Sequence, residues 1–312
     1  MKFAFVFPGQ GSQTVGMMDA WSGHPAAMEV IGQASAALGE DLGALIAQGP
    51  AEQLSLTTNT QPAMLTAGVA MYEAWRAAGG PQAALMAGHS LGEYAALTAA
   101  GSLSLADAVR IVRIRADAMQ AAVPVGTGAM AAVLGLDDEG VRAACAAASQ
   151  GEIVEAVNFN APSQVVIAGH ATAVQRAIEA AKAAGAKRAM ILPVSAPFHS
   201  SLLKPAADVL QGALAKINVA APAVPVINNV DVKIEQDPAA IRDALVRQAW
   251  HAVRWVEIVQ AMQAQGITHI VECGPGKVLT GMVKRIDPNI VALSVTDPES
   301  MQAALDALAS AG

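Results

Sequence analysis

The chain has 312 residues, with 19 Lys or Arg against 26 Asp or Glu, and its formal net charge is −7. This length allows one large domain or two, with a sizeable core. The acidic balance disfavours nonspecific nucleic-acid binding, although it leaves room for a local basic patch that binds an anionic ligand. Hydrophobic residues make up 54% of the chain, yet no apolar run reaches the roughly 18 residues that a membrane span needs.

The start of the chain and its two cysteines indicate which cellular compartment to expect. Residues 3–7 form an apolar run too short for a signal peptide, and Pro-Gly-Gln-Gly at 8–11 follows in place of a cleavage site, so we expect a first buried strand. Cys145 and Cys273 are too few for a disulfide framework, and we expect reduced thiols in a cytoplasmic protein. No His-x-x-x-His or Cys-x-x-Cys spacing occurs, which disfavours a metal site.

The Gly-rich turn after this first strand invites comparison with a dinucleotide-binding loop. The fingerprint G-x-G-x-x-G would require glycine at position 14, where Thr14 stands, and no G-x-x-x-x-G-K-[ST] motif is present. The turn is therefore expected to offer backbone N–H groups and amides to a polar ligand.

Residues 88–92, Gly-His-Ser-Leu-Gly, fit the G-x-S-x-G nucleophile elbow. The apolar run 83–87 before them predicts a strand, and residues 95–100 after them predict a helix. Such a turn would project the hydroxyl of Ser90, and the N–H of Leu91 at the helix start would point at an oxyanion. A small-residue turn with a capping serine is the alternative, and the strand-to-helix context favours the catalytic interpretation.

A catalytic serine needs a base, because its hydroxyl is a weak nucleophile until the proton is removed. Among six histidines, His199 has the best setting, in a loop at 194–201 before a predicted helix at 203–217. His89 adjoins the serine, but neighbours on a sharp turn point apart. The remaining histidines lie beside caps, turns or helix ends and are expected to be structural or solvent-facing: His24, His170, His251 and His269.

One arginine stands out on a predicted helix that is capped by Ser104 and runs to about residue 122. Arg115 falls within its apolar stripe, whereas Arg110 and Arg113 are placed to face water. An arginine on the inner face of a helix needs an anionic partner, which is either a structural carboxylate or a ligand.

The order of predicted elements indicates an α/β protein with an insertion. Residues 129–192 give β-α-β-β-α-β, the ferredoxin-like order, with a turn at 159–162 and Pro/Gly-rich boundaries at 124–128 and near 193. Elsewhere strands alternate with helices, among them a helix at 61–78 and a short strand region at 222–232, which predicts a mostly parallel sheet covered on both faces.

Six motifs occur in a fixed order, at 7–13, 88–94, 158–160, 197–200, 228–229 and 274–276. Together they resemble the malonyl-CoA:acyl carrier protein transacylase family, over essentially the whole chain. The resemblance implies an α/β-hydrolase-like core at 1–125 and 198–312 with a ferredoxin-like subdomain at 126–197. It also implies ping-pong transfer of a malonyl group from malonyl-CoA to the phosphopantetheine thiol of acyl carrier protein, without a metal or other cofactor.

The same resemblance implies a role for each site residue. A planar guanidinium can grip the malonyl carboxylate with two parallel hydrogen bonds, which suits Arg115. The histidine would be held by a backbone carbonyl, so that no acid completes a triad. The implied assignments are Ser90 as nucleophile, His199 as base, Gln10 and Leu91 as oxyanion N–H donors, Arg115 and Asn160 as substrate-binding residues, and Gln248 as the carbonyl that orients the histidine.

Coenzyme A and carrier protein are both anionic, so we expect a basic mouth near the site. The candidates are Lys187, Arg188, Lys204, Lys277, Lys284 and Arg285. We further expect a monomer that binds neither nucleic acid nor membrane and that supplies fatty-acid synthesis. Three alternatives stay open: a polyketide-pathway malonyltransferase, a serine acyl hydrolase, and a non-catalytic carrier-protein-binding module.

Overall fold

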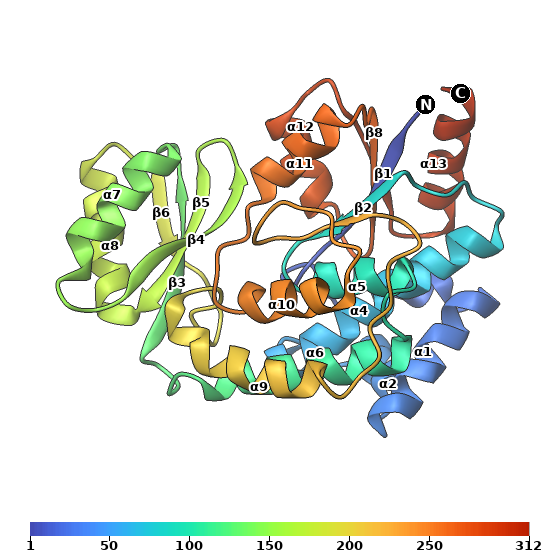
Figure 1. The fold of residues 1–312 in the computed structure, drawn as a ribbon, viewed down its shortest axis with the longest axis horizontal. Coiled ribbons are helices and arrows are strands. Elements are labelled where there is room, and N and C mark those ends of the chain that lie inside the picture. The colour runs from blue at the N-terminus through green and yellow to red at the C-terminus, as the bar shows by residue number, and fades with distance from the viewer. Residues whose placement is uncertain (312) are drawn as a thin grey trace.

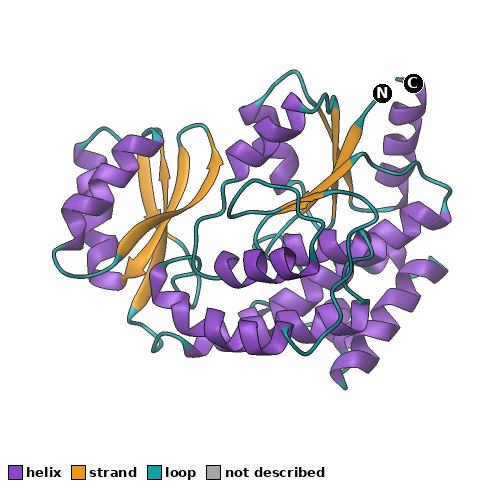
Figure 2. Cartoon of the chain, in the orientation of Figure 1, coloured by secondary structure: helices purple, strands orange, loops and turns teal. Residues whose placement is uncertain are grey.

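A computed structural model, which describes residues 1–311, places a five-stranded parallel sheet at the centre of the larger part of the chain (Figures 1 and 2). The strand order is β7-β2-β1-β8-β9, with every neighbouring pair parallel. The strands are β1 (Phe3–Phe7), β2 (Leu85–Gly88), β7 (Val226–Ile227), β8 (His269–Cys273) and β9 (Val291–Val295).

Both faces of this sheet are buried. In β1, Phe3, Phe5 and Phe7 belong to one apolar cluster, whereas Ala4 and Val6 belong to another. Successive side chains of a strand point to opposite faces, so a fully apolar strand requires cover on both sides. The sequence-based expectation of a covered parallel sheet is confirmed.

Helices and short turns provide this cover. The larger cluster is completed by α1 (Pro25–Leu38), α2 (Leu42–Gln48), α3 (Ala51–Leu54), α4 (Thr57–Ala77), α5 (Gly92–Ala99), α6 (Leu105–Ala121), α9 (Lys204–Leu214), α10 (Pro238–Gln248) and α13 (Pro298–Ser310). The other face is covered by α11 (Trp255–Ala264) and α12 (Val278–Ile286). Two 3-10 helices lie at η1 (Asp19–Trp21) and η2 (Ser201–Leu203).

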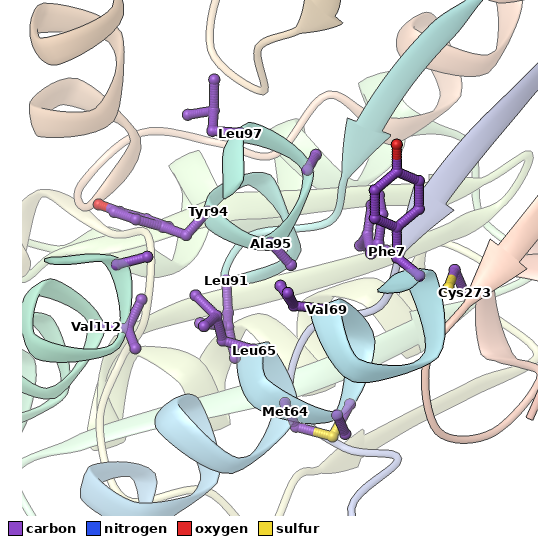
Figure 3. Packing of buried hydrophobic residues seen from close by; sticks show 14 of the residues in the cluster. Phe7, Met64, Leu65, Val69, Leu91, Tyr94, Ala95, Leu97, Val112 and Cys273 are labelled. Atoms are coloured by element: carbon purple, nitrogen blue, oxygen red, sulfur yellow. The ribbon is translucent and has the colours of Figure 1, made fainter. Parts of the chain in front are cut away.

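The helix that follows the elbow is packed into the centre of the larger cluster. Figure 3 shows Leu65 and Val69 of α4 facing Leu91 and Ala95 at the start of α5, with all four side chains buried. Close packing on every side leaves α5 no freedom to shift, which fixes the position of the residues that precede it.

A second sheet lies to one side of the first (Figure 1). It is antiparallel, with order β4-β5-β3-β6, and it has its own apolar cluster. Its elements are β3 (Gly128–Leu134), α7 (Asp138–Ser149), β4 (Val154–Ala161), β5 (Gln164–His170), α8 (Ala171–Ala183) and β6 (Arg188–Ile191). The ferredoxin-like order is thus confirmed, while the exact boundaries at 125/126 and 197/198 stay predictions.

Several predicted element bounds differ from those in the structure. Helix α4 begins at Thr57, four residues before the predicted start, and contains Pro62 within its first turns. Strand β4 runs on to Ala161 through two irregular pairings with β5, so the predicted turn at 159–162 shrinks to the two residues 162–163. In the region 222–232 only β7 forms, because the chain then turns back through irregular loop.

Within residues 1–311, no helix combines the length and apolar character required to cross a membrane. Cys145 and Cys273 are both free and buried. Burial raises the pKa of each thiol above its ordinary value, and that of Cys145 to about 12.

Candidate active site

The turn between β2 and α5 is a nucleophile elbow. Ser90 has φ 52°, a strained left-handed conformation for a residue with a side chain. A Cβ on Gly88 would lie 1.8 Å from the carbonyl carbon of Gly92, and one on Gly92 would lie 2.0 Å from the oxygen of Phe7. The two backbones approach so closely that only glycine fits at either position, as the motif predicts.

Ser90 and His199 form a hydrogen-bonded pair, with Oγ 2.7 Å from Nε2. The other ring nitrogen, Nδ1, donates to the backbone carbonyl of Gln248 at 2.8 Å. Because Nδ1 carries the proton, Nε2 is free to accept the hydroxyl proton of Ser90. Burial, and then the positive charge of Arg115, lower the pKa of His199 to about 3, so the ring is neutral at physiological pH.

The guanidinium of Arg115, from α6, reaches the same point. Its side chain is buried, and Nη2 donates to Ser90 Oγ at 3.1 Å and to Gln248 Oε1 at 2.9 Å. Nη1 donates to Gln61 Oε1 at 2.6 Å, and the guanidinium lies 5.5 Å from the ring centre of Tyr94. Every one of these partners is neutral.

No ion pair involving Arg115 occurs among residues 1–311. The structural salt bridge considered from the sequence is therefore not found in this part of the chain. A buried cation that holds only neutral partners is suited to bind an anionic ligand.

Gln10 follows β1 and Leu91 follows the serine, and both line the same cavity as Ser90. Neither backbone N–H donates a hydrogen bond to another group within the described chain. An oxyanion hole requires two N–H groups beside the nucleophile that are free to donate hydrogen bonds.

The cavity lies between the two sheets and measures about 230 Å³. The smaller sheet contributes Met130, Asn158 and Val166, together with the predicted substrate ligand Asn160. The Asn160 oxygen lies 2.8 Å from Nε2 of His89, whose ring packs on Trp255. The ring of His89 is thus held by Asn160 and Trp255, whereas the partner of Ser90 Oγ is His199, as expected for a histidine and a serine that are neighbours on a sharp turn. Burial lowers the pKa of His89.

The other four histidines lie outside the cavity. His170 Nδ1 accepts from the Ile153 N–H at 2.9 Å, and His251 Nδ1 donates to the Arg247 carbonyl at 2.9 Å. For His170 and His251, these contacts are consistent with the predicted structural or solvent-facing role. The described residues contain no group of three or more His, Cys, Asp or Glu side chains arranged to hold a metal ion.

The basic residues predicted to form a mouth lie outside the cavity lining. Lys187, Arg188, Lys277 and Lys284 are exposed. Lys204 lies 5.8 Å over the ring of Trp250. Arg285 bonds to Gln164 Oε1 and donates to the Pro162 carbonyl at 3.3 Å, so it joins α12 to the β4–β5 hairpin.

Sequence reasoning missed three buried polar side chains around the site. Gln61 holds Arg115, Glu93 bonds to Gln248, and the Asn229 oxygen accepts from the Ser90 N–H at 2.7 Å. Each is at most 2% exposed. The motifs at 88–94 and 228–229 contain Glu93 and Asn229, but nothing in the sequence shows which polar groups they meet. Gln61 lies at the predicted start of a helix, and no motif around it indicates a role in the site.

Comparison with known proteins agrees with this geometry. A family model described as acyl transferase domain matches residues 4–289. A malonyl CoA-acyl carrier protein transacylase of Escherichia coli K12 is 58% identical over 306 residues, which cover 98% of this chain and 99% of that protein. One from Bacillus subtilis is 44% identical, over 98% of this chain and 97% of that protein.

Solved structures agree as well. The crystal structure of an acyl-carrier-protein S-malonyltransferase from Burkholderia pseudomallei matches with a TM-score of 0.97 and 62% identity, over 98% of this chain and 100% of that chain. A malonyl-transacylase in complex with a type II PKS acyl-carrier protein matches with a TM-score of 0.97 and 51% identity, over 98% and 100%. On these grounds the chain belongs to the malonyl CoA-acyl carrier protein transacylase family.

Proposed function

We propose that the chain moves a malonyl group from malonyl-CoA to the phosphopantetheine thiol of an acyl carrier protein, through a malonyl ester on Ser90. The observation that carries this proposal is the position of Ser90 Oγ, 2.7 Å from the His199 base and 3.1 Å from the guanidinium of Arg115, which forms no ion pair within residues 1–311. A nucleophile beside a buried cation suits an acyl donor that ends in a carboxylate.

The first half-reaction is acylation. His199 takes the proton as Ser90 Oγ attacks the thioester carbonyl, and the N–H groups of Gln10 and Leu91 stabilise the oxyanion. The tetrahedral intermediate then breaks its carbon–sulfur bond, and the sulfur of coenzyme A takes the proton from His199 and leaves as the thiol. Meanwhile Arg115 binds the malonyl carboxylate, and Asn160 contacts the substrate from the opposite wall.

The second half-reaction reverses these roles. The thiol of the carrier protein loses its proton to His199, attacks the ester carbonyl and releases Ser90 with its proton restored. The relative whose structure was solved in complex with a type II PKS acyl-carrier protein supports a carrier protein as acceptor. Exposed Lys187, Arg188 and Lys284 are proposed to contact that acidic partner, with Arg285 beside them.

No step of this mechanism calls for a metal or redox cofactor. Four points stay predictions: that the malonyl group supplies fatty-acid synthesis, that the donor is a coenzyme A thioester, that the protein is cytoplasmic, and that it is a monomer. The polyketide alternative stays open beside them.

Intact-mass spectrometry tests the proposal. The protein is mixed with malonyl-CoA or acetyl-CoA, with Ser90→Ala as control. We expect a malonyl adduct of about +86 Da on the unmodified protein, none on the control, and little acetyl adduct. Added carrier protein should discharge the adduct. Equal labelling by both donors would contradict malonyl selection, and discharge by water alone at the same rate would favour the serine acyl hydrolase.

A further inference from the structure

Glu93 is a buried carboxylate to which the proposed mechanism gives no task. It lies three residues after Ser90, in the first turn of α5, and is 2% exposed. No ion pair within the described chain includes it. Its Oε2 instead accepts from the Asn229 N–H and from Gln248 Nε2, each at 2.9 Å. A buried acid normally has a specific partner, so these two contacts indicate its role.

Gln248 connects the three principal groups of the site. Its backbone carbonyl holds His199, its Nε2 donates to the Ser90 carbonyl at 2.8 Å, and its Oε1 accepts from Arg115 at 2.9 Å. The side-chain amide has nearly the same shape after a half turn, so its neighbours decide which end carries the oxygen.

The neighbours at the two ends of the Gln248 amide differ in whether they donate or accept hydrogen bonds. The Ser90 carbonyl and the ionised carboxylate of Glu93 can only accept, whereas the Arg115 guanidinium can only donate. With the two acceptors at one end, the amide must present Nε2 to them and Oε1 to Arg115. Reversal would place N–H against N–H at Arg115 and oxygen against oxygen at Glu93.

We propose that Glu93 is a positioning residue for the acyl-selecting arginine: it holds the Gln248 amide so that Oε1 restrains the Arg115 guanidinium beside Ser90. The inference rests on the proposed function. The intervening amide also keeps the two buried charges apart, because a direct ion pair would occupy the donors of Arg115 that are needed for a ligand carboxylate.

Asn229 gives the same carboxylate a second point of attachment. Its backbone N–H donates to Glu93, while its side chain accepts from the Ser90 N–H at 2.7 Å and donates to the Gly88 carbonyl at 2.7 Å. Loss of Glu93 could therefore loosen the elbow as well as the amide. An effect on the elbow would slow every acyl donor equally, whereas an effect through Gln248 would slow malonyl transfer selectively.

The test compares kcat/KM for acylation by malonyl-CoA and by acetyl-CoA. Glu93→Ala should lower the malonyl-to-acetyl ratio at least about tenfold. Glu93→Gln, whose amide oxygen can still accept both hydrogen bonds, should restore the ratio to within about threefold of the unmodified protein. Leu308→Ala, a buried change in the remote helix α13, is the control for lost stability and should leave the ratio unchanged.

An equal fall with both donors in Glu93→Ala would overturn the proposal, and so would a Glu93→Gln variant as unselective as Glu93→Ala. If Glu93→Ala does not fold, Gln248→Met removes the amide but keeps the backbone carbonyl that holds His199. That variant should lower the malonyl-to-acetyl ratio of kcat/KM, and an unchanged ratio would again overturn the proposal. Failure of the unmodified protein to accept malonyl at all would contradict the proposed function instead.

Discussion

The Arg115 guanidinium and the Ser90 hydroxyl are hydrogen-bonded, with Nη2 3.1 Å from Oγ. Ser90 Oγ accepts from this permanent donor and so directs its own proton toward His199 Nε2, 2.7 Å away. The residue proposed to select the acyl group therefore touches the nucleophile itself. Changes at Arg115 should consequently affect both donor selection and the protonation of the dyad.

Arg115→Lys keeps the charge but loses the planar pair of donors. Because charge-assisted hydrogen bonds contribute about 1.5–3 kcal/mol, we expect kcat/KM for malonyl-CoA to fall by roughly 10- to 100-fold. Acetyl-CoA should be much less affected. Arg113→Lys, a change on the same helix, is the matched control. Arg113 was predicted to face water, but it forms an ion pair with Glu40 instead. Similar losses for both donors would argue against carboxylate recognition.

The pH dependence of acylation should reflect the lowered pKa of His199. With this pKa near 3, the ring is neutral well below its ordinary titration range, so kcat/KM for malonyl-CoA should stay flat from pH 8 to about pH 5. Stopped-flow measurement of single-turnover acylation provides the profile. A half-maximal rate near pH 6.5 would show that the histidine titrates as if exposed.

Removal of the neighbouring charge should move that profile in a defined direction. In Arg115→Met the cation no longer opposes protonation of His199, so the pKa of the ring should rise. The acidic limb of acetyl-CoA acylation should therefore move to higher pH than in the unmodified protein. An unchanged limb would mean that burial alone sets the protonation of the base.

Glu93 should make folding stability depend on pH. Burial raises its pKa from 4.5 to about 7 in the folded protein, so the folded state binds the proton more tightly than the unfolded state does. Stability is then highest below about pH 4.5 and falls as pH rises toward 7. Glu93→Gln cannot ionise, and its advantage should grow over this window to about 2–4 kcal/mol at pH 8.

Denaturant titrations of Glu93→Gln and the unmodified protein at several pH values measure this difference. Glu29→Gln, the same substitution on the exposed side of α1, is the control. A difference that stays constant between pH 4.5 and 8 would contradict a buried, ionising carboxylate.

Gly88→Ala should disrupt the elbow. The added Cβ would lie 1.8 Å from backbone carbon of Gly92, and main chain on both sides is packed too closely to yield. We expect acylation to fall by at least about 100-fold, with a lower Tm. Gly212→Ala in α9 meets no atom within 4 Å and should be neutral or stabilising by up to about 1 kcal/mol. Near-normal acylation by Gly88→Ala would contradict the tight-turn assignment.

Local patterns account for what could be predicted from the sequence. The strand, the glycine-flanked serine and the helix of the elbow follow from apolar runs and from the glycines at 88 and 92 in the G-x-S-x-G motif. The β-α-β-β-α-β order likewise follows from periodicity along residues 129–192. Boundaries were less well predicted: β4 extends through Asn160 because its pairing with β5 continues past irregularities that no local pattern reveals.

Local spacing along the chain is enough to predict the fold class, the serine of the elbow and the family to which six ordered motifs point, because each of these is expressed by residues close together in sequence. Which polar groups meet depends instead on the tertiary arrangement. Gln61, Glu93, Gln248 and Asn229 come from four separate segments, and their roles depend on donors and acceptors brought together across up to 158 positions of the chain. Hydrogen bonds between such distant residues leave no periodic trace in the sequence, because burial and packing alone select their partners.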